Sequence, residues 1–198
     1  AAAAATADAA AAEVEKMGYP VVMKVISPDI LHKSDAGAIR LNISSATEAR
    51  AAFASIVESS LKYKKDARIE GVLVEKMAPK GPEIIVGMRR DPQFGPLIMF
   101  GLGGIYVELF TDIAFRITPL NRSAAKQMIM ETRAGALLAG LRGQKPADMD
   151  AVVDILLRLA QLSVDFPRIS EIEINPLLVY EQGKGALALD ARAILKEV

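Results

Sequence analysis

The sequence contains no cysteine, only one histidine and no excess of either charge. The lack of cysteine excludes disulfide bonds, thiolate metal sites and cysteine nucleophiles, and it fits a reducing cytoplasm, where we expect the protein to work. Basic and acidic residues number 24 each, so the formal net charge is zero. This balance argues against a dedicated nucleic-acid binder and against electrostatic attraction to a membrane surface. No apolar run approaches the roughly 18 residues that a membrane span needs, so we expect no membrane association.

The chain is 198 residues long and 52% apolar, which suits one large domain or two lobes of roughly a hundred residues each. Residues 1–12 are nearly all alanine, a composition with high helix propensity. We derive no chemistry from this run and expect residues 1–17 to be a poorly defined segment. Segment 78–82, Ala-Pro-Lys-Gly-Pro, contains two prolines and a glycine. It is typical of a stiff linker between a small lobe, 18–78, and a large lobe, 79–198.

Hydrophobic periodicity predicts an α+β fold class. Helices are expected at 45–63, where Ser45 and Glu48 match a capping box, and at 121–132, 134–141 and 147–165. Strands are expected at 20–26, 38–43, 69–75, 83–88, 96–100, 171–180 and 186–191, with an extended segment at 105–117. Because strands and helices do not alternate regularly, the pattern favours α+β lobes over a doubly wound sheet.

The single histidine, His32, lies in a polar loop that follows an expected strand containing Lys24. A lysine at the rim of a strand can direct its charge toward an anion. A histidine can act as a general base or carry a phosphoryl group. Lys33 and Ser34 come next, and Gly37 closes the loop. A capped turn with an incidental histidine is the alternative, and the loop alone does not decide between them.

The C-terminal hairpin carries a second set of polar residues. If its turn is centred on Gln182 and Gly183, Asn175 lies directly opposite Asp190, with Cβ atoms roughly 5 Å apart. A carboxylate and an amide oxygen that converge on one point are ligands that Mg²⁺ accepts. The alternative is a polar cross-strand pair that only caps the hairpin. Pro176 should mark an edge or a bulge, because proline cannot donate to a sheet.

The segment around the linker has acids at the ends of two strands, Glu75 before it and Glu83 after it. A cleft between lobes is a preferred ligand site, and a flat apolar slot beside exposed backbone amides suits a purine. Glu83 could then accept hydrogen bonds from ribose hydroxyls. Solvated acids at two strand ends are the alternative.

Together these features resemble an ATP-grasp domain. More narrowly, the chain resembles the nucleotide-binding β subunit of ADP-forming acyl-CoA synthetases, the acetate–CoA ligase branch of the succinyl-CoA synthetase superfamily. The resemblance covers residues 18–192 and rests on the motifs at 18–24, 27–37, 70–75, 91–96, Phe100-Gly-Leu-Gly-Gly104 and Glu173-Ile-Asn-Pro-Leu177. It implies an ATP-grasp fold of two lobes with the nucleotide in the cleft between them.

The resemblance also implies a role for each residue singled out above. Lys24 would contact nucleotide phosphates, and His32, Lys33 and Ser34 would lie in the nucleotide-binding loop of the small lobe. The adenine slot would be lined by Glu75, through the amino group, and by Met77 and Ala78, through their backbone. Glu83 would hold the ribose, Asn175 and Asp190 would bind Mg²⁺, and Glu173 would lie close to the path of phosphoryl transfer.

The implied reaction is acetyl-CoA + ADP + phosphate = acetate + CoA + ATP, with ATP or ADP as substrate. His32 would take the phosphoryl group from a histidine on a partner α subunit and pass it to ADP. Because the chain has no recognisable CoA-binding domain, the α subunit would supply it, in an α2β2 assembly. One departure is Ala38, where most relatives are expected to have a second glycine after Gly37. An alanine is tolerable there unless its φ angle is positive.

Two other functions compete with this one. The same kind of domain occurs as a regulatory module with degraded catalytic residues in some protein lysine acetyltransferases. A purely structural interaction subunit is the other. The presence of Lys24, His32, Glu83, Asn175 and Asp190 disfavours both.

Overall fold

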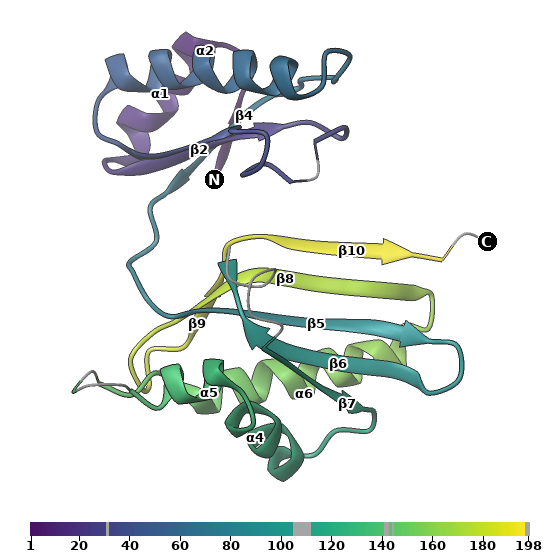
Figure 1. Cartoon of the computed structure of the whole chain (residues 1–198). Coiled ribbons are helices and arrows are strands. Elements are labelled where there is room, and N and C mark those ends of the chain that lie inside the picture. Colours follow the sequence, from purple (N-terminus) through teal and green to yellow (C-terminus); the bar gives the residue numbers. More distant parts are fainter. Residues whose placement is uncertain (31, 105–111, 141–142, 144, 197–198) are drawn as a thin grey trace. The chain divides into compact units, whose positions relative to one another are not determined.

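The computed structural model describes residues 1–30, 32–104, 112–140, 143 and 145–196. The chain divides into two compact units, an N-terminal unit, Ala1–Pro79, and a C-terminal unit, Lys80–Val198. The boundary expected after Ala78 is adjacent to this division. Each unit combines one antiparallel sheet with helices on one of its faces, which confirms the α+β fold class (Figure 1). No helix in the described ranges is long and apolar enough to cross a bilayer.

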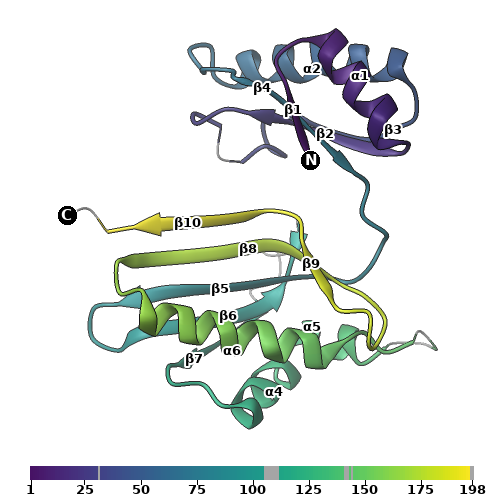
Figure 2. The same cartoon turned by 180° about the vertical axis from the view of Figure 1, so that it is seen from behind.

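The N-terminal unit is a four-stranded sheet in the order β1-β4-β2-β3. Its elements are β1 (Ala2–Ala4), α1 (Ala7–Met17), β2 (Val21–Ile26), β3 (Ile39–Ile43), α2 (Ala46–Tyr63) and β4 (Gly71–Lys76). Both helices lie on the same face of the sheet (Figures 1 and 2). Alternate residues of β2 and β4 are buried in the hydrophobic cluster that includes the helices, among them Met23 and Val74. The intervening residues therefore lie on the face that the helices leave uncovered.

The first 17 residues are well formed, and the expectation of a poorly defined segment is wrong. Residues Ala2–Ala4 pair antiparallel with β4, and Ala7–Met17 form α1. The helix begins because Oγ1 of Thr6 accepts a hydrogen bond from the amide of Ala9 at 3.2 Å. Small residues of α1, including Ala10, are buried against the rest of the unit. Tertiary packing thus adds to the high helix propensity of alanine.

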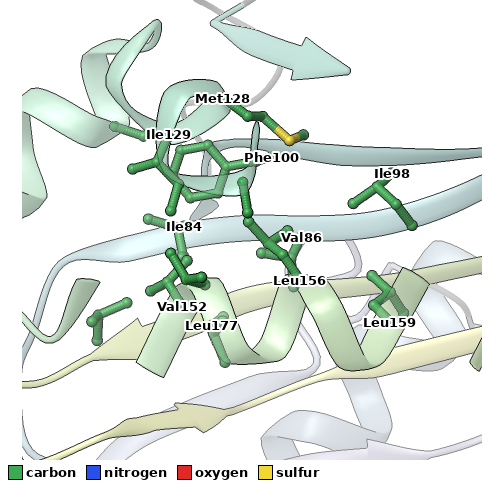
Figure 3. Packing of buried hydrophobic residues seen from close by; sticks show 14 of the residues in the cluster. Ile84, Val86, Ile98, Phe100, Met128, Ile129, Val152, Leu156, Leu159 and Leu177 are labelled. Carbon is green, nitrogen blue, oxygen red and sulfur yellow. The ribbon is translucent and has the colours of Figure 1, made fainter. Parts of the chain in front are cut away.

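The C-terminal unit is a six-stranded antiparallel sheet in the order β10-β8-β5-β6-β7, with β9 also paired to β8. Its strands are β5 (Glu83–Asp91), β6 (Gly95–Leu102), β7 (Ile113–Ile117), β8 (Ile169–Val179), β9 (Ala186–Ala188) and β10 (Ala191–Leu195). Its helices are α4 (Arg122–Met130), α5 (Arg133–Leu138) and α6 (Met149–Asp165). The helices pack on one face of the sheet, where Phe100, Met128 and Leu156 are fully buried (Figure 3).

The predicted elements of both units largely match the observed ones. Half of the expected capping box is present, because Oγ of the N-cap residue Ser45 accepts from the amide of Glu48 at 3.1 Å. The Glu48 carboxylate reaches back one residue further than the motif requires and accepts from the amide of Ser44 at 2.7 Å. The expected helix at 134–141 ends at Leu138. Of the extended segment expected at 105–117, Ile113–Ile117 is strand β7, and 105–111 lie outside the described residues.

Candidate functional site

Lys24 and Glu75 lie together on the uncovered face of the N-terminal sheet. The register pairs Val22 with Glu75, so Lys24 is diagonally opposite this acid on the neighbouring strand. The Nζ atom of Lys24 is 2.9 Å from Oε2 of Glu75, and the two side chains are 14% and 29% exposed. Partial burial makes this ion pair stronger than one in open solvent. The pair holds the lysine head on the open face, where an anion could approach it.

The His32 loop connects β2 to β3 and is folded by its own backbone. The amide of Ala36 donates to the carbonyl of His32 at 3.2 Å, and the amide of Ala38 donates to the carbonyl of Lys33 at 2.9 Å. Gly37 has a φ angle of 57°, which favours glycine. Ala38 is fully buried and its φ angle is not positive, so the departure from two adjacent glycines is tolerated. His32 and Ser34 are exposed.

Asp29 anchors the start of this loop to the rest of the unit. Its Oδ2 accepts a hydrogen bond from the amide of Arg68 at 2.7 Å, and its Oδ1 lies 3.5 Å from Nζ of Lys64. The Arg68 amide is the main reason why the pKa of the Asp29 carboxyl lies below its ordinary value, and the charge of Lys64 adds to the effect. The loop that presents His32 is therefore attached through a carboxylate that stays ionised at neutral pH.

Met77 and Ala78, the two residues expected to line an adenine slot through their backbone, follow β4 and are half-buried. The amide of Met77 donates to the carbonyl of Pro20 at 3.1 Å. This contact fixes the chain where it leaves β4.

The register of the C-terminal hairpin agrees with the prediction. Ile174 lies opposite Ala191 and Leu177 opposite Ala188, which places Asn175 and Asp190 opposite each other. The amide of Asn175 donates to the carbonyl of Asp190 at 3.1 Å. The expected irregularity at Pro176 is also present, because the pairing of β8 with β5 shifts between Ile84 and Val86, the partners of Leu177 and Ile174.

A glycine turn after β6 brings Glu83 and Asn175 into contact with one residue, Gly104. The amide of Gly104 donates to Oδ1 of Asn175 at 2.9 Å. A Cβ atom on Gly104 would collide with Oε2 of Glu83, so the carboxylate lies against the glycine backbone. The neighbouring Gly103 amide donates to the Glu83 carbonyl at 3.0 Å. The turn therefore groups the expected ribose ligand with one of the expected metal ligands.

Glu173 faces Arg192, which the sequence analysis did not consider. The two residues are register partners on β8 and β10. Nη2 of Arg192 lies 3.2 Å from Oε2 of Glu173 and 2.7 Å from Oε1 of Glu171. The same hairpin register that pairs Asn175 with Asp190 would have identified Arg192 from the sequence.

The donor set at Asn175 and Asp190 fits Mg²⁺. The two residues offer one amide oxygen and one carboxylate, both hard oxygen ligands. Mg²⁺ usually takes one or two protein oxygens, keeps several waters and binds phosphate oxygens with the remainder. In the described part of the chain no group of three or more histidine, cysteine, aspartate or glutamate residues could hold a metal, so a site supplied entirely by such side chains is not found there.

The chain is similar to known proteins along most of its length. The ATP-grasp domain model matches residues 1–195. The β subunit of ADP-forming acetate–CoA ligase I from Pyrococcus furiosus is 50% identical over 91% of this chain and 77% of that protein. ADP-forming acetate–CoA ligase I from Archaeoglobus fulgidus is 50% identical over 92% of this chain but only 26% of that protein. The chain thus matches most of a separate β subunit and about a quarter of a longer ligase.

Solved structures agree with these sequence relationships. Acetyl-coenzyme A synthetase 1 of Ca. Korarchaeum cryptofilum, in complex with coenzyme A and Ca-AMPCP, has a TM-score of 0.90 and 43% identity, over 98% of this chain and 84% of that one. A complex of the same enzyme with coenzyme A and Mg-AMPPCP has a phosphohistidine segment that points towards its nucleotide-binding site. That structure has a TM-score of 0.79 and 41% identity, over 94% of this chain and 81% of that one.

Proposed function

The chain belongs to the ATP-grasp domain family, among the β subunits of ADP-forming acetate–CoA ligases, and from this we propose that it is the nucleotide-binding subunit of such a ligase. The reaction is acetyl-CoA + ADP + phosphate = acetate + CoA + ATP. The observation that carries the proposal is the contact of Glu83 and Asn175 with Gly104, with Asp190 opposite Asn175 in the hairpin, in a chain that is 50% identical to a ligase β subunit.

In the N-terminal unit, Lys24 would bind nucleotide phosphates. It would exchange part of its attraction to Glu75 for the phosphate charge, so the pair would keep the ammonium in place before the nucleotide arrives. Lys33 and Ser34 would add a second cation and a hydroxyl from the loop. Met77 and Ala78 would contact the adenine through their backbone, with Glu75 at its amino group.

In the C-terminal unit, the carboxylate of Glu83 would accept hydrogen bonds from the ribose hydroxyls. Asn175 and Asp190 would hold Mg²⁺, and Gly104 would orient the amide oxygen of Asn175 for that task. When bound, Mg²⁺ neutralises charge on the phosphates. Glu173 would lie beside the transferred group, where its position is set by Arg192.

His32 would carry the phosphoryl group in two steps. In the first, a neutral ring nitrogen of His32 attacks the phosphorus of a phosphohistidine on the partner. The new N–P bond forms as the partner's N–P bond breaks, and the partner's imidazole leaves. In the second, a terminal oxygen of the β-phosphate of ADP attacks, the His32 N–P bond breaks, and ATP forms. Positioning and charge neutralisation supply most of the catalysis in such transfers. Because His32 is exposed, both groups would be able to reach it.

The partner would be an α subunit that carries the CoA-binding domain and the first phosphohistidine, in an α2β2 assembly. Two facts support a partner: the relatives at this length are named β subunits, and in longer relatives this region is about 26% of the protein. We propose that the complex works in the cytoplasm, a reducing compartment that suits a sequence with no cysteine.

The competing functions are less favoured. A regulatory ATP-grasp domain of a protein lysine acetyltransferase, or a purely structural subunit, would not need Lys24, His32, Glu83, Asn175 and Asp190 together. All five are present, and the relatives named above are ligases.

Purification of the native complex and an assay of ATP formation test the proposal. With acetyl-CoA, ADP and Mg²⁺, we expect ATP to form only when inorganic phosphate is added. ATP formation that does not depend on phosphate, or a complex without any ATP formation, would contradict the assignment.

A further inference from the structure

Arg192 connects two acids on the uncovered face of the C-terminal sheet. Glu171 and Glu173 are separated by one residue on β8, and Ile172 between them is packed in the core on the other face. Both side chains therefore extend from the same face of the sheet, from Cα atoms about 7 Å apart along the strand. Two carboxylates at this spacing repel each other unless a cation lies between them.

Arg192 supplies that cation. Its Nη2 lies 2.7 Å from Oε1 of Glu171 and 3.2 Å from Oε2 of Glu173. The arginine is itself placed by backbone pairing, because β10 pairs with β8 and puts Arg192 opposite Glu173. The three side chains are 29% to 40% exposed, so they are neither deeply buried nor fully solvated.

From this geometry we infer that Arg192 is a positioning residue that holds the Glu173 carboxylate for phosphoryl transfer. Glu171 makes the shorter contact and fixes the guanidinium, and the guanidinium then fixes Glu173. The inference rests on the proposed function, because it takes from it the place of Glu173 beside the transferred group. Arg192 acts only through Glu173 and need not touch the substrate.

Both contacts use the same nitrogen, Nη2. A single donor atom that bridges two carboxylates can be replaced in part by a lysine ammonium, which is a compact charge with three donors. The conservative variant Arg192→Lys should therefore keep part of the effect, whereas Arg192→Gln should lose it.

A matched control lies on the helix-covered face of the C-terminal sheet. Arg122 at the start of α4 contacts both Asp150 and Asp154 of α6, through Nη2 and Nη1, and its side chain is 50% exposed. This arginine also bridges two carboxylates, but it lies in the helix layer. The variant Arg122→Gln also removes an arginine that bridges two carboxylates, but the inference predicts no effect of this change on the reaction.

The test compares kcat for ATP formation, the Kd for Mg-ADP and Tm for five forms of the native complex: wild type, Arg192→Gln, Arg192→Lys, Glu173→Gln and Arg122→Gln. We expect Arg192→Gln to lower kcat by about 10- to 100-fold, since small misplacements of a group near the reaction have effects of this size. The Kd for Mg-ADP and Tm should stay close to the wild-type values. Arg192→Lys should recover part of the kcat, and Arg122→Gln should match wild type.

A second arm separates this inference from the proposed function. In the double variant Arg192→Gln/Glu173→Gln, kcat should be no lower than in Glu173→Gln alone, because Arg192 acts through that acid. The inference would be overturned if the kcat losses of the two single variants multiplied in the double variant. It would also be overturned if Arg192→Gln had wild-type kcat while Glu173→Gln had a lower kcat. Either result would leave the proposed function intact. A wild-type complex that forms no ATP from acetyl-CoA, ADP and phosphate would overturn the proposed function itself.

Discussion

The amide of Gly104 donates a hydrogen bond of 2.9 Å to Oδ1 of Asn175, across 71 residues of sequence. The same glycine lies against the carboxylate of Glu83. One backbone turn thus sets the position of an acid proposed to bind ribose and the direction of an amide proposed to bind Mg²⁺.

The variant Gly104→Ala should weaken nucleotide binding. Gly104 has a φ angle of 65°, and a Cβ atom there would push the Glu83 carboxylate away. Gly95→Ala is the matched control, because Gly95 has a φ angle of 74° but nothing lies within 4 Å of its Cβ position. Both variants should lose about 1 kcal/mol of stability from backbone strain, whereas only Gly104→Ala should raise the Kd for Mg-ADP in calorimetry. Equal Kd values for the two variants would show that the turn does not position the site.

The variant Glu83→Ala should weaken ADP binding by about 10-fold or more, because hydrogen bonds from hydroxyls to a carboxylate contribute roughly 1.5–3 kcal/mol. Its fold should be little affected, since Glu83 is exposed at the start of β5. The control ligand is 2′,3′-dideoxy-ADP, which lacks the two ribose hydroxyls that Glu83 is proposed to bind. Wild type should bind it more weakly than ADP, and Glu83→Ala should bind the two alike. If Glu83→Ala still prefers ADP to the dideoxy nucleotide as strongly as wild type does, the ribose role is misplaced.

The variant Asp190→Asn should raise the Mg²⁺ concentration needed for half-maximal ATP formation by about tenfold or more, because an amide replaces the one charged ligand that the protein offers. Titration of activity with Mg²⁺ measures this directly. Asp154→Asn, in α6 on the helix layer, is the control and should not change the Mg²⁺ requirement. A wild-type Mg²⁺ curve for Asp190→Asn would rule out the proposed metal pair.

The variant Asp29→Ala should loosen the His32 loop, lower Tm by a few degrees and reduce the phosphorylation of His32. The pKa of Asp29 is lowered in the folded state, chiefly by the Arg68 amide. Its stabilising effect is therefore present above the ordinary value of 3.8 and is lost as the pH falls through the lowered folded value. The difference in Tm between wild type and Asp29→Ala should be constant near neutral pH and shrink as the pH falls below 3.8.

Glu48→Ala is the control for the loop, because the pKa of Glu48 is also lowered, by the Ser44 amide at the start of α2. It should show the same kind of pH dependence in Tm without an effect on His32 phosphorylation. If both variants reduce phosphorylation equally, the effect of Asp29 is on general stability and not on the loop.

Local patterns predicted much of this structure. Alternation and turn residues gave most strands of both sheets within a few residues, although β1 was not predicted and β10 extends beyond the strand expected at 186–191. The assumed hairpin turn gave the observed pairing of Asn175 with Asp190. These features depend on neighbours in sequence, which explains why they could be predicted. Arg192 was within reach of the same register argument and was missed because that argument was applied only to the pair Asn175 and Asp190.

Other features depend on contacts that local patterns do not encode. The bond from Gly104 to Asn175 joins distant segments, and the ion pair of Lys24 with Glu75 depends on the pairing of β2 with β4, strands that are far apart in sequence. The alanine-rich segment of α1 was expected to be poorly defined, yet its small side chains pack against the rest of the unit, a tertiary contact that composition does not reveal.

Transfer of radioactive phosphate tests the central claim, that His32 is phosphorylated by the partner subunit and passes the phosphoryl group to ADP. The native complex and its His32→Ala variant are incubated with Mg²⁺ and [γ-³²P]ATP, and the label on each subunit is counted after denaturation. The account predicts acid-labile label on this chain in wild type, no label on this chain in His32→Ala, and loss of ATP formation from acetyl-CoA in the variant. A His32→Ala complex that still labels this chain and turns over at the wild-type rate would contradict it.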